Sequence, residues 1–350
     1  MQMPEIRIIQ SSDHQAWDQH LQSHEQCGPY LTTAWKNAVE EGYGHKTFYL
    51  AAYNEDVIVG VLPLVLVKSF MTKGVLVSLP FCDYGGILAT DPQITVALIN
   101  RALDLADEMH AALEIRNPRP CLEIEQEFIY ARCTDKCRMV LELPGSAREL
   151  WSGFKAKLRS QIKKGAKNGL VFRIGGVSYS DDFYRVFSRN MRDLGSPVHS
   201  VKWLNSVVSS FGENARIGVV YKGADPIGAG IILMCKNTVT IPWASTLKRF
   251  NKLGPNMLLY WSFLEYAADL GCQYFDFGRS MPGEGTYVFK QQWGTRPVPL
   301  AWYRISRNSH QRPFSNADGL LRNVVERVWC RLPLTVANTI GPHVRKYINR

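Results

Sequence analysis

The sequence has no long apolar run and no cysteine motif, and these absences exclude several classes of protein. Its longest apolar run, Val57 to Val67, has 11 residues and contains Pro63, which is too short for a transmembrane helix. The start, MQMPEIRIIQ, lacks a basic segment followed by an apolar one, so we expect no signal peptide. The eight cysteines form no CxxC pair and have no histidine at zinc-finger spacing. We therefore expect a cytoplasmic protein with reduced thiols and no bound metal.

Positive charge is in excess, and it is concentrated in two segments. The chain has 350 residues, enough for two domains, and a net charge of +10. Residues 155–173 carry seven basic side chains and no acidic one, and residues 304–350 carry nine basic against two acidic. Each segment is open to two interpretations: a solvated helix face, or a surface for a phosphate-bearing partner.

An internal repeat indicates that the chain contains two copies of one unit. VSLPFCDYGGIL from Val77 aligns with VTIPWASTLKRF from Val239 at an offset of 162, and this offset continues into ALEIR (112–116) and YFDFG (274–278). Upstream, Tyr53 aligns with Tyr221 at an offset of 168, and the six-residue difference lies in a longer hairpin, VKSFMTKG, in the first copy. Each copy is predicted to run helix, strand, turn, strand, turn, strand, helix, strand, an α+β order.

The segment FDFGRSMPGEGTYVFKQQWG (275–294) is unusual because it combines an acid, an arginine, four glycines, a lysine and a tryptophan with two short apolar runs. We interpret FDFG as the last strand of the second copy and GTYVFK as a further strand, which the first copy lacks. That asymmetry places the predicted chemistry in the second copy.

This segment resembles the FemAB family, whose proteins contain two tandem acyltransferase domains of the GNAT type. The resemblance rests on the aromatic-Asp-aromatic strand and the FK-x-x-aromatic-Gly ending, and is supported by LRSQIKKGAKNGL (158–170) and PFCDYGGIL (80–88). FDFGRS, GSPVHS (195–200) and WCRLPLTVANTIGP (329–342) extend it to FemAB-like proteins associated with PEP-CTERM/exosortase systems. The chain lacks the charged helical hairpin that several cell-wall Fem enzymes insert, so the resemblance does not extend to a tRNA contact.

The resemblance implies a fold, a division of the chain and a reaction. We expect two GNAT-like domains, each a mixed sheet flanked by helices: residues 1–150 on the acceptor side, residues 151–305 carrying the catalytic groups, and a basic helical tail over 306–350. The implied reaction transfers an acyl or aminoacyl group to an amine of a peptidoglycan or exopolysaccharide precursor. The donor is then aminoacyl-tRNA or an acyl-CoA, with no bound cofactor and no stable nucleic-acid complex.

Lys290, Asp276 and Asp83 are the catalytic candidates. Acyl transfer to an amine needs fixed donors for the developing oxyanion and a group that accepts a proton. Lys290 is the predicted donor, on one face of a GTYVFK strand with Thr286 and Val288; the alternative is an ordinary edge-strand lysine. Asp276 is predicted to orient Lys290, to accept the amine proton, or only to bridge Arg279. Asp83 lines the acceptor cleft by resemblance, although an aspartate in a glycine-rich turn is typically a turn former.

The substrate-binding candidates are arginines that suit phosphate and polar or aromatic side chains of the same motifs. They are Arg279, Tyr84, Arg159, Trp243, His199, Tyr287 and Trp293. An isolated histidine such as His199 more often caps or packs than catalyses. The pair His20 and His24 has ligand-like spacing but lacks a third ligand, so we interpret it as surface.

A phosphate site is predicted where GPN (254–256) begins a helix, because the free N–H groups of a first helical turn favour anions. The candidates there are Lys248, Arg249 and Asn256. The loop RFNKLGPN departs from the usual CoA-binding pattern of GNAT enzymes by its spacing and its proline. The sequence therefore favours an acyl-CoA donor less than aminoacyl-tRNA.

The tail carries an apolar stripe at helical spacing, flanked by arginines and ended by Pro333. The stripe consists of Leu320, Leu321, Val324, Val325, Val328, Trp329 and Leu332. A basic amphipathic helix with a tryptophan is typical of peripheral contact with an anionic membrane, and packing onto the first domain is the alternative. A third function therefore stays open beside the two transferases: a non-catalytic adaptor at the inner face of the plasma membrane.

Overall fold

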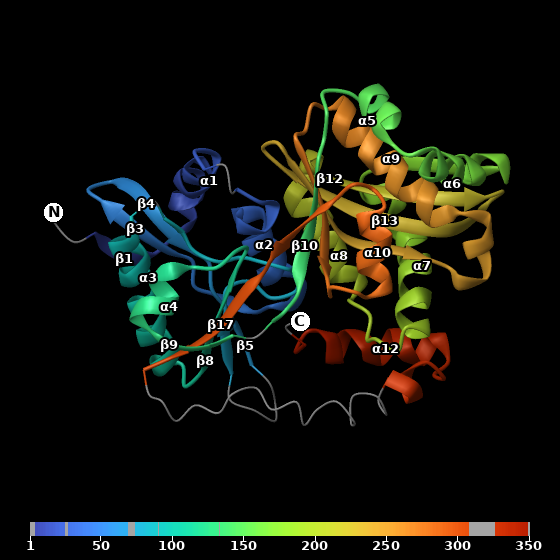
Figure 1. The fold of residues 1–350 in the computed structure, drawn as a ribbon. Helices are drawn as coiled ribbons and strands as arrows, with labels where there is room; N and C mark the ends of the chain where they lie inside the picture. The colour runs from blue at the N-terminus through green and yellow to red at the C-terminus, as the bar shows by residue number, and fades with distance from the viewer. Residues whose placement is uncertain are drawn as a thin grey trace. The chain divides into compact units, whose positions relative to one another are not determined.

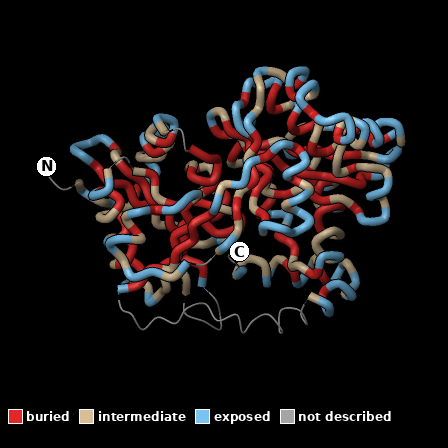
Figure 2. Tube along the Cα trace, viewed as in Figure 1, coloured by how far each residue is buried: buried red, intermediate tan, exposed pale blue. Residues whose placement is uncertain are grey.

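The computed structural model describes residues 4–24, 27–68, 74–89, 91–132, 134–307 and 326–348. These form two compact units: residues 4–138, 298–307 and 347–348 make unit 1, and residues 139–297 and 326–346 make unit 2. Residues 139–150, predicted with the first domain, thus belong to unit 2, and residues 298–305, predicted with the second, belong to unit 1. In both units buried residues run along the strands and along the inner faces of the helices (Figure 2).

Unit 1 contains a four-stranded sheet in the order β1-β3-β4-β7 and a six-stranded sheet in the order β2-β5-β6-β8-β17-β9 (Figure 1). The strands are β1 (Glu5–Ile8), β2 (Lys46–Thr47), β3 (Leu50–Asn54), β4 (Val57–Leu62), β5 (Val65–Val67), β6 (Val75–Val77), β7 (Leu88–Ala89), β8 (Ala112–Asn117), β9 (Ile129–Arg132) and β17 (Ala301–Ser306). The helices are α1 (His14–Gln22), α2 (Thr33–Tyr43), α3 (Pro92–Glu108) and α4 (Leu122–Glu127). Leu98, Ile99, Ala102 and other apolar residues of α3 pack into the core over these strands.

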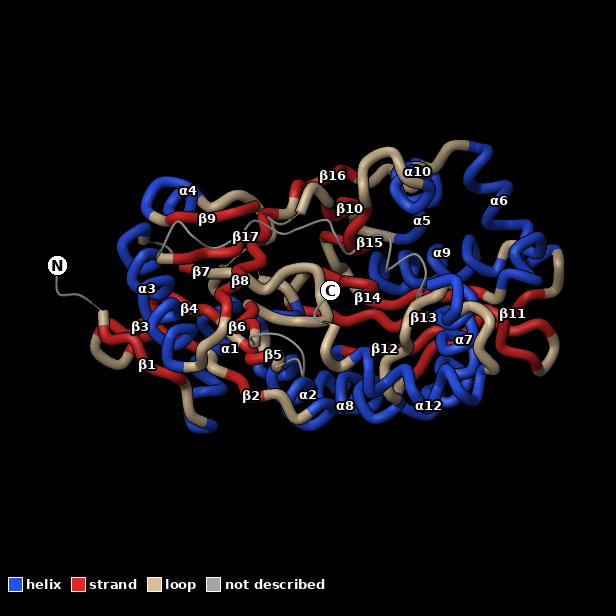
Figure 3. Tube along the Cα trace, turned by 90° about the horizontal axis from the view of Figure 1, so that it is seen from below, coloured by secondary structure: helices blue, strands red, loops and turns tan. Residues whose placement is uncertain are grey.

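Unit 2 has one seven-stranded sheet in the order β11-β12-β13-β14-β15-β10-β16. Its strands are β10 (Cys137–Glu142), β11 (Leu170–Gly175), β12 (Ala215–Lys222), β13 (Asp225–Cys235), β14 (Thr238–Thr246), β15 (Tyr274–Ser280) and β16 (Arg296–Pro299). Its helices are α5 (Ala147–Gly153), α6 (Ala156–Lys167), α7 (Ser180–Asp193), α8 (Val201–Phe211), α9 (Pro255–Asp269), α10 (Gly285–Gln291) and α12 (Leu334–Arg345). Helices α5, α6, α9 and α10 lie on one side of the sheet, and α7, α8 and α12 on the other (Figure 3).

The two units repeat the same strand pattern, which confirms the duplicated GNAT-like α+β fold expected from the sequence. The first hairpin of each copy has a β-bulge at the equivalent position, between Ala52 and Tyr53 in β3 and between Val220 and Tyr221 in β12. A helix then links two parallel strands: α3 links β6 to β8, and α9 links β14 to β15. The helix α9 begins at Pro255, and Gly254 (φ 85°) and Gly271 (φ 74°) adopt the left-handed conformation at its two ends.

A proline explains why the sheets of the two copies differ. The eleven-residue strand β13 of unit 2 corresponds to β4 and β5 in unit 1, which are interrupted at Pro63. Proline lacks the N–H group that a central ladder requires, so the strand breaks there and unit 1 has two sheets. The predicted longer hairpin joins β5 to β6, which pair through Val67 and Val75, and its tip at 69–73 lies outside the described residues.

Each copy contributes a strand to the sheet of the other unit. β10 follows the first copy in sequence but lies between β15 and β16 of unit 2, whereas β17 follows the second copy and lies between β8 and β9 of unit 1. In Figure 1 the orange β17 therefore runs among the blue and green strands of unit 1. This exchange accounts for the shift of both domain boundaries.

The predicted strand GTYVFK is wrong, because Gly285–Gln291 form the helix α10. Phe289 in the helix and Trp293, two residues beyond its end, both pack against Tyr260, which stabilises the helix despite its β-favouring residues. The first copy also has a helix, α4, at the equivalent place after β8, so the segment is not unique to the second copy. What differs between the copies is its side chains.

The tail, predicted to be helical over 306–350, forms the helix α12, which follows the predicted apolar stripe rather than coinciding with it. Pro333 ends the preceding helical pattern as expected, but it also serves as the N-cap of α12, which belongs to unit 2 and packs on α7. The helix α12 therefore packs within unit 2, whereas residues 347–348 belong to unit 1. Of the predicted stripe, Leu320, Leu321, Val324 and Val325 lie outside the described residues.

Candidate active site

The candidate site of unit 2 begins where the parallel pair β14 and β15 stops pairing. The register joins Thr238 to Tyr274, Val239 to Phe275 and Thr240 to Asp276. Because β14 continues to Thr246 and β15 to Ser280, both strands run beyond this short ladder. The backbone groups of residues past Asp276 therefore lie beyond the end of this ladder.

Asp276 lies fully buried at the last pair of the ladder. One of its carboxylate oxygens, Oδ1, accepts a hydrogen bond of 2.8 Å from the backbone N–H of Gly278. Gly278 has a φ of 74°, a left-handed conformation that glycine adopts at low cost, so the carboxylate holds a turn inside the strand. An aspartate is rarely buried without such a partner.

Lys290 reaches the same turn from α10. Its ammonium Nζ donates hydrogen bonds to the backbone carbonyls of Gly278 at 3.0 Å and Arg279 at 2.8 Å, and its side chain is buried. Asp276 and Lys290 thus bind the N–H and the C=O of one residue, Gly278. The structure therefore brings the predicted Asp276 and Lys290 together at this turn. Lys290 reaches it from a helix, not from the predicted strand.

An aromatic cluster surrounds the turn. The ring of Tyr260 stacks on Phe277 with centroids 5.3 Å apart and an interplanar angle of 5°, and Phe289 packs edge-on against Tyr260. Burial raises the pKa of the Tyr260 phenol well above its ordinary value, so the hydroxyl stays protonated. Sequence reasoning missed Tyr260, which lies on the helix predicted to begin at 254–256.

The other candidates of the 275–294 segment have different environments. Arg279 is half-buried at the end of β15, and Tyr287 is half-buried on α10. Trp293 is fully buried in the aromatic cluster, with Phe154 edge-on at 5.7 Å. Arg279 and Tyr287 thus have surface available to a substrate, whereas the Trp293 ring packs in the core.

His199 and Trp243 lie together in the core of unit 2, with their ring centroids 5.8 Å apart. The imidazole stacks on Trp203, and its Nε2 accepts a hydrogen bond of 3.1 Å from Nε of Arg345 in α12. Burial, together with the Arg345 charge, holds the pKa of His199 well below its ordinary value. The neutral ring therefore connects α12 to the core. This is the packing role that the sequence analysis gave as the alternative to catalysis for His199.

The predicted phosphate site at α9 is partly covered by α6. Lys248 and Arg249 are exposed on the short 3-10 helix η5 (Lys248–Leu253), and Asn256 is half-buried in the first turn of α9. Gly165 of α6 lies so close that a Cβ there would be 3.4 Å from the carbonyl of Gly254. The helix α6 therefore packs on this turn.

Arg159 lies on the same helix α6, half-buried, and its Nη1 donates to the backbone carbonyl of Ser152 at 3.3 Å. This hydrogen bond connects α6 to α5. The basic segment 155–173 accordingly forms α6 and β11, with most of its lysines exposed.

In unit 1, Asp83 and Tyr84 lie in the turn between β6 and β7. Leu79 and Phe81 of this turn both have a φ of 67°, a left-handed conformation that costs a bulky residue about 1–3 kcal/mol. Tyr84 is buried against Arg138, whose guanidinium lies 4.4 Å from the ring centroid. Asp83 is half-exposed and its carbonyl accepts a hydrogen bond from Trp302. Such strain is typical of functional turns.

A buried ion pair supports this turn and was missed from the sequence. Arg116 is fully buried and donates from Nε and Nη2 to Glu114 at 2.8 and 2.7 Å. Its Nη1 points to the carbonyl of Leu79 at 3.5 Å, and its guanidinium lies over Trp302. Glu114 aligns with Asp276, so each copy has a buried acid on the equivalent strand.

No metal site is formed within the described ranges: no three His, Cys, Asp or Glu side chains gather there to hold an ion. The Nε2 atoms of His20 and His24 lie 3.2 Å apart, half-buried rather than on the surface as predicted, and burial is the main cause that lowers the pKa of His20. No helix in the part of the chain that the structure describes has the length and apolar character to cross a membrane.

Comparison with protein families matches residues 152–291, most of unit 2, to the family described as Acetyltransferase (GNAT) domain. Comparison with curated proteins gives no match. The matched residues include Asp276 and Lys290.

Solved structures share the whole fold at low sequence identity. FemX superposes with a TM-score of 0.69 at 13% identity, covering 92% of this chain and 100% of FemX. The C-terminal domain of a protein assigned as a lysylphosphatidylglycerol synthetase from Agrobacterium fabrum has a TM-score of 0.58 at 13% identity, covering 91% of this chain and 96% of that one. A tandem GNAT protein from the clavulanic acid biosynthesis pathway has a TM-score of 0.55 at 11% identity, covering 87% and 99%. The chain thus has the tandem GNAT fold.

Proposed function

We propose that this protein is an N-acyltransferase that moves an acyl or aminoacyl group onto an amine of a cell-envelope precursor. The observation that carries the proposal is the turn at Gly278, where a buried carboxylate accepts from the N–H and a buried ammonium donates to the C=O of one residue, beyond the β14–β15 ladder. A site that keeps two opposite charges buried on rigid elements suits the stabilisation of charge that develops during acyl transfer.

In the proposed reaction the acceptor amine attacks the carbonyl carbon of the donor. The new C–N bond forms an amide, the C–O bond of an ester or the C–S bond of a thioester breaks, and the released oxygen or sulfur takes up a proton. We assign the stabilisation of the oxyanion to the positive charge of Lys290 and acceptance of the amine proton to Asp276. Arg279 and Tyr287, which keep exposed surface beside the turn, are the proposed substrate contacts.

For the donor, we favour an aminoacyl ester such as aminoacyl-tRNA over an acyl-CoA. The packing of α6 on the first turn of α9 supports this choice, because that turn is where a pyrophosphate would bind. Asn168 at the end of α6 also donates to the carbonyl of Leu253, at 3.0 Å. The family match of residues 152–291 favours an acyl-CoA, which therefore remains the second candidate.

For the acceptor, we propose a phosphate-bearing precursor of peptidoglycan or exopolysaccharide, reached from the cytoplasmic side of the plasma membrane. One structural neighbour is named for lysylphosphatidylglycerol, an aminoacylated envelope lipid, which fits this class of acceptor. The half-exposed Asp83 and the strained turn around it support an acceptor site in unit 1. Exposed Val336, Ile340 and Val344 at four-residue spacing on α12 support peripheral membrane contact. An exosortase-linked role depends on the sequence resemblance alone.

The test is direct. Purified protein is incubated with aminoacyl-tRNA or with acyl-CoA, with and without an amine-bearing lipid-linked precursor, and the product is measured by mass spectrometry. We expect the donor to be consumed only when the acceptor is present. A protein that binds the precursor but consumes neither donor would instead support the adaptor.

A further inference from the structure

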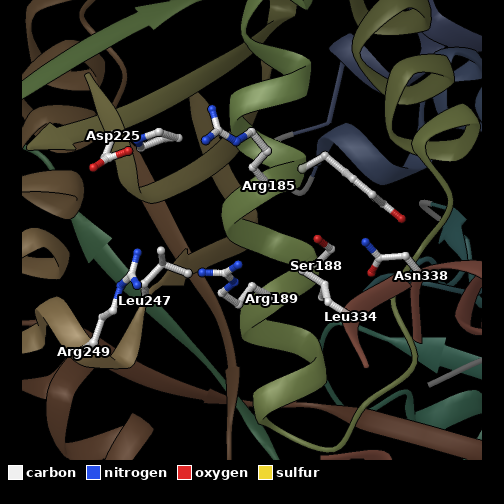
Figure 4. Close-up of a pocket in the computed structure, with 10 residues that line it drawn as sticks. Arg185, Ser188, Arg189, Asp225, Leu247, Arg249, Leu334 and Asn338 are labelled. Atoms are coloured by element: carbon white, nitrogen blue, oxygen red, sulfur yellow. The ribbon is translucent and has the colours of Figure 1, made fainter. Parts of the chain in front are cut away.

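Unit 2 contains a cavity of about 290 Å³ on the face of the sheet opposite α9. Helix α7 forms one wall, the start of β13 and the residues after β14 form another, and α12 closes the third (Figure 4). Its lining consists of Tyr184, Arg185, Ser188, Arg189, Asp225, Pro226, Leu247, Arg249, Leu334 and Asn338. The volume is near the lower end for small-molecule pockets, which begin at about 300 Å³.

The charges around this cavity are unbalanced in favour of an anion. Arg185, Arg189 and Arg249 line it, against the single lining carboxylate of Asp225, and Arg185 is also paired with Asp182 outside the lining, at 3.4 Å. Arg189, which is half-buried, makes no hydrogen bond or ion pair with the residues that the structure describes, and Figure 4 shows its guanidinium extending toward Leu247 and Arg249. Guanidinium groups gathered in a concave site attract anions, and they bind phosphate in a two-pronged geometry.

A buried amide on the opposite wall adds a second polar group. The side-chain oxygen of Asn338, on α12, is buried and has no hydrogen-bond partner within the described ranges. A buried polar atom without a partner is unfavourable in a folded protein, and because an amide oxygen only accepts, an O–H or N–H donor of a ligand at this position removes the cost. Ser188, whose residue is buried, supplies a hydroxyl beside it on α7.

We propose that this cavity binds the phosphate monoester or diphosphate group of a small ligand. Arg189 and Arg249 hold the phosphate oxygens, Ser188 donates its hydroxyl to them, and the Oδ1 atom of Asn338 accepts from an O–H group of the ligand. Because α12 supplies Leu334 and Asn338, an occupied cavity holds α12 more firmly on α7. Arg249, a sequence candidate for the phosphate site at α9, thus lines this other cavity instead. The proposal goes beyond the proposed acyl transfer, and its test does not depend on that reaction.

Isothermal titration of the full-length protein with inorganic pyrophosphate at constant ionic strength tests the site. We expect saturable binding that weakens as salt is raised, and a melting temperature that rises with pyrophosphate. Arg189→Ala and Arg249→Ala should each weaken binding about tenfold or more, as expected when a charge-assisted hydrogen bond is lost. Arg148→Ala, an exposed arginine on α5 outside the cavity, is the matched control and should bind as the unmodified protein does.

Asp225→Asn provides a test with the opposite sign. Removing the single carboxylate of the lining should tighten pyrophosphate binding, and because Asp225 is exposed the substitution should leave folding intact. If Asp225→Asn and Arg189→Ala change the affinity in the same direction, or if Arg148→Ala weakens binding as much as Arg189→Ala does, the proposed site is wrong. Circular dichroism of each variant excludes a loss of folding as the cause.

Lipid vesicles distinguish a phosphate that belongs to a lipid headgroup from one that belongs to a soluble ligand. Binding to phosphatidylcholine vesicles with added phosphatidic acid, sensitive to Arg189→Ala and blocked by pyrophosphate, assigns the site to a lipid headgroup. Binding of pyrophosphate without vesicle binding assigns it to a free phosphorylated metabolite. Absence of both overturns the proposal.

Discussion

Replacing Lys290 by methionine tests whether the turn at Gly278 depends on the ammonium. Methionine keeps a similar unbranched length and volume but removes the hydrogen bonds to the carbonyls of Gly278 and Arg279. A hydrogen bond to a charged group contributes about 1.5–3 kcal/mol, and burying an apolar side chain in place of an ammonium returns part of the loss. We therefore expect the free energy of unfolding to fall by roughly 2–4 kcal/mol.

Urea denaturation followed by tryptophan fluorescence measures this loss, because Trp293 is buried in the cluster next to α10. The matched control is Lys202→Met, an exposed lysine on α8, which should change stability by less than about 0.5 kcal/mol. Turnover, measured at a temperature where the variant stays folded, should fall by about 100-fold or more, since a preorganised donor is lost.

The outcomes separate the two roles of Lys290. A variant as stable as the unmodified protein would show that the contacts with Gly278 and Arg279 do not hold the turn, which would refute the structural reasoning. A destabilised variant with unchanged turnover would leave the turn in place but remove Lys290 from the chemistry.

Three further predictions concern other parts of the two units. Because the pKa of His199 is depressed by burial, its stabilising contribution is complete above about pH 6.5 and should be lost at roughly 1.4 kcal/mol per pH unit below it; His199→Gln should flatten this dependence in pH-dependent melting. Glu114→Gln leaves the Arg116 guanidinium buried without its carboxylate and should lower the free energy of unfolding, measured in urea, by about 3–5 kcal/mol. Adding Arg116→Met should restore much of this loss. A Glu114→Gln variant as stable as the unmodified protein would contradict this. Gly165→Leu should push α6 away from Gly254 and cost about 1–3 kcal/mol, an expectation that an unchanged melting curve would overturn.

The duplicated fold was predictable because its signals are local and repeat. Tyr53 and Tyr221 align at an offset of 168 and the later segments at 162, and the structure has a β-bulge beside each tyrosine. The start of α9 was predictable for the same reason, since a proline in the first turn and a glycine beyond the end are local marks of a helix.

The exchange of β10 and β17 was not predictable, because an alternating strand pattern shows that a strand forms but not which sheet receives it. The helix α10 was missed because Thr286, Val288 and Phe289 favour strands, and the contacts of Phe289 with Tyr260 and Trp293 outweigh that preference only in the folded chain. A local sequence pattern does not contain those contacts.

The candidate site was predictable in part. Asp276 and Lys290 were identified from one segment, and the structure brings both to Gly278. Arg116 was missed because arginine is rarely buried. Its partner Glu114 does not differ in the sequence from an ordinary polar residue of a strand. Tyr260 was missed because the sequence does not distinguish an aromatic residue beside a site from one that only packs in the core of a helical protein.

The central claim is that the turn held by Asp276 and Lys290 catalyses transfer of an acyl group to an amine. The most direct measurement is mass spectrometry of the product formed from aminoacyl-tRNA and an amine-bearing envelope precursor, with unmodified protein, Lys290→Met and the Lys202→Met control. We predict a new amide on the precursor with the unmodified protein and the control, and about 100-fold less with Lys290→Met. Equal product from all three proteins, or no amide from either aminoacyl-tRNA or acyl-CoA with a folded protein, would contradict the account.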